Sequence, residues 1–196
     1  DLPELSSLIR MADLRVQLSS GSEKDQLLPL LPSGVDHQKT VAFLLDLTRH
    51  TPRDLLQLLQ FLQDFAPVDG RPTREQMLNG ARKYSIEYFM PEIQDELVGF
   101  LPQAHIAVLI SLISAAGKRT LLYSELQDLV EARDNRVPSD FNLSAALSAL
   151  YECSAVGVVK SNRGNDTYSF KYRNRFSDFG MAKRLILHRG VWRALN

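Results

Sequence analysis

Hydrophobic residues recur at helical spacing through the first hundred positions of the chain. An amphipathic helix turns an apolar side chain toward the core every three or four residues. The first such stripe consists of Leu5, Leu8, Ile9, Ala12 and Val16. It ends at the polar run 19–24, and a second stripe predicts a helix over 36–49. Residues 27–34 lie between them and contain two prolines, which predicts a loop or a short turn.

A third helix has a clear start signal in the sequence. Thr51 is the predicted N-cap, Pro52 takes the first helical position, and Asp54 follows three residues after the cap. The leucines that follow continue to residue 62 at helical spacing. The sequence therefore predicts a helix that begins at Pro52.

A fourth helix repeats this pattern and contains a proline. Thr73 and Gln76 have the spacing of a capping box, and the helical pattern continues through 84–100. Pro91 lacks a backbone N–H and clashes with the preceding turn. We therefore expect two helical pieces that meet near Phe89.

The pattern changes after Pro102, where short apolar runs alternate with helices. The expected elements, in order, are a helix that ends on Gly117, a strand over 119–123, a helix capped by Ser124, a helix over 139–154 and a β-hairpin around 162–166. This is the order of a winged helix-turn-helix. A strand over 185–188 and a helical turn from Val191 complete the chain, and the pattern does not say where they pack.

The predicted fold class is mainly α. We expect a helical, lid-like domain over 1–101, followed over 102–196 by a winged helix-turn-helix domain that has a small β-hairpin and a C-terminal extension.

Composition narrows the class of protein. With 44% hydrophobic and 23% charged residues, the chain is typical of a globular protein, and its longest apolar run, 106–117, is too short to span a membrane. The single cysteine excludes an intrachain disulfide, and we expect a cytoplasmic location. The chain starts at Asp1 without a methionine or a secretion signal, so we expect a fragment of a longer protein.

Charge is distributed unevenly although the formal net charge is zero. Residues 158–196 carry nine basic and two acidic side chains, a net charge of +7, so the remainder carries −7. Acidic residues gather at Glu87, Glu92, Asp95 and Glu96. Two interpretations stay open: this segment pairs internally with the basic C-terminal segment, or it binds a metal or a basic partner.

No catalytic motif is legible in the chain. Gly117 and Lys118 resemble the end of a phosphate-binding loop, but Leu112 and Arg119 stand where that motif needs a glycine and a hydroxyl. No histidine pair has metal-ligand spacing, and Cys153 has no companion base. We therefore assign no reaction and no metal to this chain alone.

Nucleic acid is a natural ligand for a winged helix. The helix predicted over 139–154 would enter the major groove, yet it has no Lys or Arg, and Asn142 is its one plausible base reader. The hairpin region offers basic residues that alternate with aromatic ones. A DNA-binding regulator would grip phosphates through this wing with Lys160, Arg163, Lys171, Arg173 and Arg175.

The order of elements, with four sequence segments, resembles the C-terminal half of bacterial P-loop ATPases of the AAA+/STAND type. The segments are 51–60, 84–100, 170–174 and 187–196. In that family a helical lid follows the nucleotide-binding core and precedes a winged helix. The resemblance implies that Arg53, after Pro52, is the nucleotide-sensing "sensor 2" arginine that reaches the γ-phosphate of ATP.

The same resemblance implies a division of labour within a longer protein. Neither a Walker A nor a Walker B sequence occurs in this chain, so ATP and Mg²⁺ would be bound only together with an upstream core. The chain would then be the nucleotide-sensing and interaction or output region. Its expected partners are that core and other protein subunits.

Arg53 has an unusual electrostatic position. A cation in the first helical turn is disfavoured by about 0.3–1 kcal/mol, because the unpaired N–H groups there carry partial positive charge. A phosphate would reverse this, since both the helix start and the guanidinium attract it. The alternative is that Arg53 pairs with Asp54, Asp46 or a backbone carbonyl, or is simply solvated.

Overall fold

A computed structural model describes residues 6–68, 70–133, 136–162, 165–180 and 183–196. The chain divides into two compact units, Asp1–Phe89 and Met90–Asn196, and each is described separately. The division lies before the boundary predicted between residues 101 and 102. Helix α5 (Met90–Val98) accounts for the difference, because it packs against helices of the second unit.

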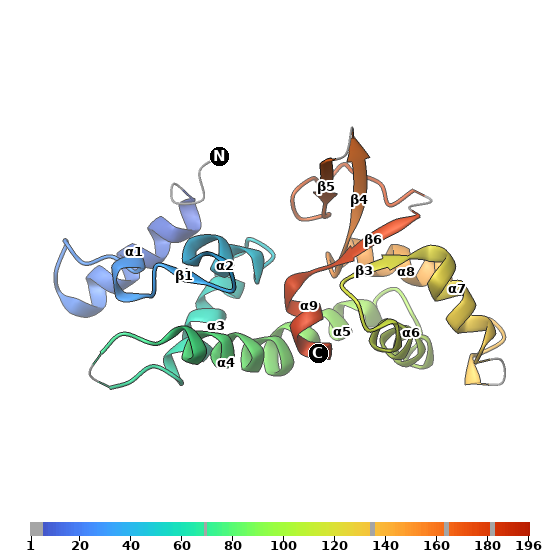
Figure 1. The fold of residues 1–196 in the computed structure, drawn as a ribbon, viewed down its shortest axis with the longest axis horizontal. Helices are drawn as coiled ribbons and strands as arrows, with labels where there is room; N and C mark the ends of the chain where they lie inside the picture. Colours follow the sequence, from blue (N-terminus) through green and yellow to red (C-terminus); the bar gives the residue numbers. More distant parts are fainter. Residues whose placement is uncertain (1–5, 69, 134–135, 163–164, 181–182) are drawn as a thin grey trace. The chain divides into compact units, whose positions relative to one another are not determined.

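The first unit consists of helices and one small β-hairpin (Figure 1). Helices α3 and α4 pack closely against each other. A Cβ atom at Gly80 would lie 2.9 Å from the carbonyl oxygen of Phe61, so α4 approaches the α3 backbone at a residue without a side chain. The elements are α1 (Ser7–Ser20), the 3₁₀ turn η2 (Leu28–Leu30), β1 (Gly34–Val35), β2 (Gln38–Lys39), α2 (Thr40–Asp46), α3 (Pro52–Gln63), α4 (Arg74–Tyr84) and the π-helical turn η3 (Ser85–Phe89).

The helix predicted over 36–49 starts later than expected, at Thr40. Strands β1 and β2 pair antiparallel, and the turn between them holds Asp36 and His37 at φ of 53° and 60°. Asp and His tolerate this left-handed region better than most residues. The Thr40 hydroxyl donates a hydrogen bond to the Pro32 carbonyl. The prediction was therefore wrong for 36–39, which form the turn and β2, and for 47–49, because α2 ends at Asp46.

The division of the fourth helix takes the form of a π-helical turn. Helix α4 runs into η3 at Ser85, and α5 begins at Met90 without an intervening loop. Pro91 in the first turn of α5 cannot donate to Glu87, and its ring would clash with the carbonyl of that residue in a regular helix. A wider turn before the proline accommodates both effects. The predicted interruption near Phe89 is thus present, as a change of helix type.

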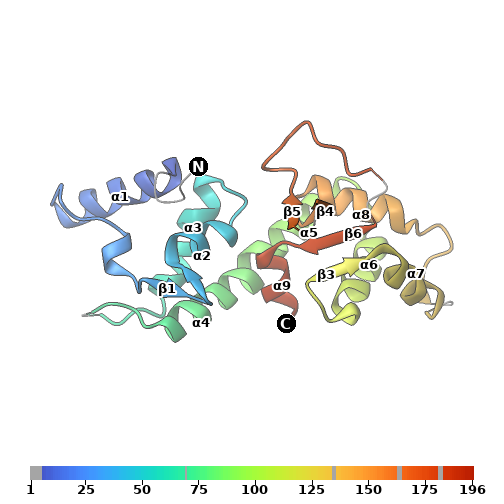
Figure 2. The same cartoon turned by 45° about the horizontal axis from the view of Figure 1, so that its top comes forward.

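The second unit contains a four-stranded antiparallel sheet, whose strands lie in the order β3-β6-β4-β5 (Figure 2). The predicted order of helix, strand, helix, helix and hairpin is confirmed. Besides α5, the elements are α6 (Gln103–Ala116), β3 (Thr120–Leu122), α7 (Tyr123–Glu131), α8 (Leu143–Glu152), β4 (Val156–Asn162), β5 (Asn165–Ser169), β6 (Arg184–Leu187) and α9 (Arg189–Leu195). The chain as a whole is predominantly helical with small antiparallel sheets.

Strand β6 has a place that the sequence pattern did not give. It lies between β3 and β4, with Leu121 opposite Leu185 and Gly157 opposite Ile186. Its residues Leu185, Ile186 and Leu187 are buried, and neighbouring strands pair with both of its edges. The strand predicted over 185–188 is therefore the centre of the sheet.

Several local predictions in the second unit need correction. The helix predicted over 139–154 is α8, which begins at Leu143 after Asn142 as the N-cap residue and ends at Glu152. Helix α7 begins at Tyr123, after Leu122 as the N-cap residue, so Ser124 is not the cap. The Glu125 carboxylate accepts a hydrogen bond from the Leu122 N–H and takes over this role. Strand β5 ends at Ser169, so the basic run that follows is a turn.

The acidic and basic segments meet within the second unit. Helix α5, which contains Glu92 and Glu96, packs against α9, which contains Arg189 and Arg193. This packing agrees with the internal-pairing interpretation of the charge asymmetry. Among the described residues there is no group of three or more His, Cys, Asp or Glu side chains that could hold a metal ion.

Candidate functional site

The start of helix α3 is built as predicted. The Thr51 hydroxyl accepts a hydrogen bond from the Asp54 N–H at 3.1 Å, and Pro52 occupies the first helical position. Arg53 is exposed at the next position. The cap fixes the direction of the first turn, and with it the point from which the Arg53 side chain departs.

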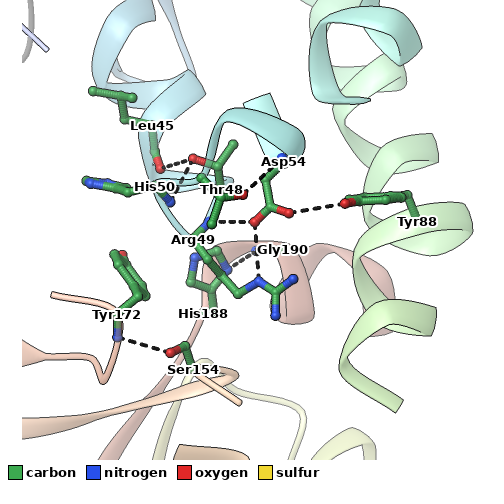
Figure 3. A network of polar contacts seen from close by, with 11 residues as sticks. Leu45, Thr48, Arg49, His50, Asp54, Tyr88, Ser154, Tyr172, His188 and Gly190 are labelled. Atoms are coloured by element: carbon green, nitrogen blue, oxygen red, sulfur yellow. Dashed lines mark hydrogen bonds and ion pairs between the residues drawn. The ribbon is translucent and has the colours of Figure 1, made fainter. Parts of the chain in front are cut away.

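The neighbouring carboxylate is buried and held by two residues (Figure 3). Asp54 is 1% exposed. One carboxylate oxygen accepts from the Arg49 N–H at 3.0 Å and from Arg49 Nε at 3.2 Å, and the other accepts from the Tyr88 hydroxyl at 3.2 Å. Burial of this charge is tolerated because it has both an ion-pair partner and hydrogen-bond donors.

The π-helical turn η3 places two aromatic rings under two arginines. The Arg53 guanidinium carbon lies 5.7 Å from the centre of the Tyr88 ring. The corresponding distance from Arg49 to Phe89 is 5.6 Å. Both are cation–π distances, and such contacts hold a guanidinium over the ring face. Tyr88 therefore contacts both members of the pair Arg53 and Asp54.

This arrangement can attract an anion. Pro52 has no N–H and the Asp54 N–H binds Thr51, so the exposed Arg53 guanidinium is the main attraction for an anion at this helix start. A phosphate could accept hydrogen bonds from the guanidinium.

Neither Arg49 nor Tyr88 was predicted from the sequence as part of this site. Arg49 lies two residues before the cap, and its role depends on a backbone that folds back toward Asp54. Tyr88 is far from Asp54 along the chain, so only the packing of η3 against α3 brings the two together. The one signal in the sequence was Pro91, which marks the irregular turn that carries Tyr88.

The five basic residues nominated for a DNA-binding wing differ in their surroundings. Lys160 is exposed on β4, Arg175 is exposed after the hairpin, and Arg163 lies outside the described residues. Lys171 forms an ion pair with Glu152 at 3.1 Å and donates to a backbone carbonyl. The Arg173 guanidinium carbon lies 5.6 Å from the centre of the neighbouring Tyr172 ring. Lys171 and Arg173, two of the five nominated residues, thus make contacts within the chain.

Other residues of the second unit also contact helix α8. Asn142, the one base reader nominated in this helix, is the N-cap, and its side chain accepts from the Ala145 N–H at 3.0 Å. The Phe179 ring packs 5.7 Å from the Tyr151 ring, and Lys171 pairs with Glu152 at the end of the helix. The segment that follows the hairpin therefore contacts the C-terminal half of α8.

The remaining polar candidates have structural roles. Lys118, from the sequence that resembles a phosphate-binding loop, pairs with Glu125 and lowers the pKa of that carboxyl below its usual range. His188 is buried, and its Nδ1 atom accepts from the Gly190 N–H at the start of α9. His105 is buried, and its Nε2 atom lies 3.2 Å from Oδ1 of Asp140.

No family model, curated protein or solved structure matches this chain. Across the residues that the structure describes, no helix has the length and apolar character needed to cross a membrane.

Proposed function

We propose that this chain is the nucleotide-sensing and output region of a P-loop ATPase whose nucleotide-binding core lies outside residues 1–196. The observation that carries the proposal is the exposed Arg53 guanidinium over Tyr88, at the capped start of α3. A cation at this position gains free energy when an anion joins it, because the helix start attracts the same charge. The γ-phosphate of ATP, presented by the core, would be that anion.

The finer fold assignments belong to the same proposal. The first unit would act as the helical lid, and the order of α6 to β6 in the second unit is that of a winged helix. In this proposal the winged helix is the output domain, which contacts other protein subunits. ATP and Mg²⁺ would be bound by the core, with Arg53 as the one contribution from this chain, and the protein would act in the cytoplasm.

Tyr88 suggests how the nucleotide state would reach the second unit. Its ring lies under Arg53, its hydroxyl donates to Asp54, and it belongs to the π-helical turn that ends where the second unit begins. A phosphate that draws the Arg53 guanidinium away from the Tyr88 ring would remove one contact of Tyr88 in this turn. Coupling requires such a difference in contact between two states.

The test uses the full-length protein, with its core, and measures ATP binding and hydrolysis for Arg53→Ala. Loss of one charge-assisted contact to phosphate is expected to reduce ATP affinity or the rate of hydrolysis by about tenfold or more. Arg53→Lys should recover part of the loss, since it keeps the charge but not the planar fork.

Arg82→Ala is the matched control, because Arg82 is an exposed arginine on helix α4. It should leave ATP binding and hydrolysis unchanged. The proposal is wrong if Arg53→Ala behaves like this control, or if no P-loop precedes this region in the full protein.

The alternative is a DNA-binding regulator that uses the wing. Lys160 and Arg175 are exposed and support it, whereas the roles of Lys171 and Asn142 within the unit weigh against it. A gel-shift assay with duplex and single-stranded DNA at low salt decides the question. Binding that weakens steeply with added salt would favour this alternative, and absence of any shift would exclude it.

A further inference from the structure

Helix α3 has more apolar side chains than the core of the first unit buries completely. Leu55, Leu58 and Leu62 are buried. Leu56 and Leu59 are half-buried, and together with Leu62 they line a groove. The half-buried leucines widen the apolar stripe of α3 onto the surface, where the described part of the first unit does not cover them fully.

The groove lies between α1, α3 and the loops that follow each of them. Its volume is about 1200 Å³, above the usual range of pockets for small molecules. Val16, Leu30 and Leu31 add to its apolar lining, and Leu30 is 45% exposed. Exposed apolar surface of this kind is typical of an interaction site.

All charged residues in the described lining are arginines. Arg15 on α1 and Arg71 before α4 border the groove, and Arg71 and Arg74 line a hollow that adjoins it at Leu31. No Asp or Glu occurs among the described residues that line either one, and Asp69 lies outside the described residues. The apolar groove thus has a cationic border.

The rim that α3 contributes is polar and regular. Gln57, Gln60 and Gln63 recur every three residues along the edge of the groove and offer amide hydrogen bonds. Neither β1 nor β2 takes part in the lining, so an added β-strand would find no strand edge here. The surface instead has the features of a groove that receives a helix.

From this geometry we infer that the groove docks an amphipathic helix of a partner protein, one that carries acidic residues beside its apolar stripe. The apolar side chains of the partner contact Leu56, Leu59 and Leu30, and its carboxylates pair with Arg15 and Arg71. This inference does not depend on the proposed nucleotide sensing, because the groove involves neither Arg53 nor Tyr88.

The test measures binding of two labelled synthetic peptides to the chain by fluorescence anisotropy. Both peptides are about 16 residues long and place leucines at i, i+3, i+4 and i+7, with flanking glutamates in one and flanking lysines in the other. The glutamate peptide should bind about tenfold more tightly at low salt, and the difference should shrink as salt is added.

Three variants of the chain sharpen the result. Combined Arg15→Glu and Arg71→Glu should reverse the preference toward the lysine peptide. Leu59→Asp should abolish binding of both, because it puts a charge into the apolar lining. Arg10→Glu is the control on α1, since Arg10 lines a different hollow, and it should leave both affinities unchanged. Far-UV circular dichroism checks that each variant is folded.

Three results would overturn the inference. One is equal binding of both peptides, or binding that Leu59→Asp does not reduce. Another is concentration-dependent dimerisation that Leu59→Asp abolishes, which would show that a second copy covers the groove. The third is displacement of the glutamate peptide by dodecanoate at concentrations below those that form micelles, which would assign the groove to a fatty acid.

Discussion

Replacing Asp54 by alanine is expected to destabilise the first unit by about 3–5 kcal/mol. Asp54 is 1% exposed and the side chain of its partner Arg49 is 12% exposed, so the variant leaves a largely buried guanidinium without its carboxylate. Breaking a buried ion pair by removing one member costs about this much. Folding free energies are typically about 5–15 kcal/mol, so the loss is large.

A double-mutant cycle separates the ion pair from the other contacts of each residue. Arg49→Ala should also be destabilising, because it leaves the carboxylate buried. The double variant should be more stable than the sum of the two losses predicts, with a coupling free energy of about 2 kcal/mol. Arg53→Ala is the matched control. It loses a cation–π contact of about 0.5–1 kcal/mol and removes a similar repulsion from the helix start, so its net effect should be near zero.

Urea unfolding provides the assay, with two optical signals. Far-UV circular dichroism follows both units, whereas Trp192 is the sole tryptophan of the chain and belongs to the second unit. The variants of Asp54 and Arg49 should lower the midpoint seen by circular dichroism. A loss below about 1 kcal/mol for Asp54→Ala, or a coupling near zero, would refute the conclusion that this pair anchors the start of α3.

Two further predictions concern packing and pH. Gly80→Ala should destabilise the first unit by about 1–3 kcal/mol, despite the better helix propensity of alanine, because the added Cβ meets the α3 backbone; thermal unfolding measures this. Glu125→Gln should lower stability at pH 7, and the loss should be smaller at an acidic pH well below the usual pKa of a glutamate. The hydrogen bond from Lys118 lowers the pKa of this carboxyl in the folded state, so its contribution is lost as pH falls through that pKa; unfolding at both pH values checks this.

Local signals in the sequence predicted most helices and the start of α3. Thr51 and Pro52 specify a helix start through contacts within one turn, so no other part of the chain is needed to recognise it. Gly117 likewise ends α6 at φ of 60°, a conformation that glycine adopts without strain. Such features can be predicted because the residues that specify a helix end lie within a few positions of it.

The rest depends on contacts between distant residues. Neither the central place of β6 in its sheet nor the bond from Tyr88 to Asp54 has a local signature, because each requires the whole unit to be folded. The candidate site was predicted only at Arg53. The packing around it, through Arg49, Asp54 and Tyr88, became visible when the backbone brought these residues together.

The position of β6 has a consequence for the order in which the protein forms during synthesis. Strands β3 and β4 do not pair with each other, because β6 (Arg184–Leu187) lies between them. Some sixty residues separate β3 from this strand, and loops of that length close slowly. On the ribosome, the first unit could complete its contacts while the sheet of the second waits for the last residues of this region to leave the exit tunnel.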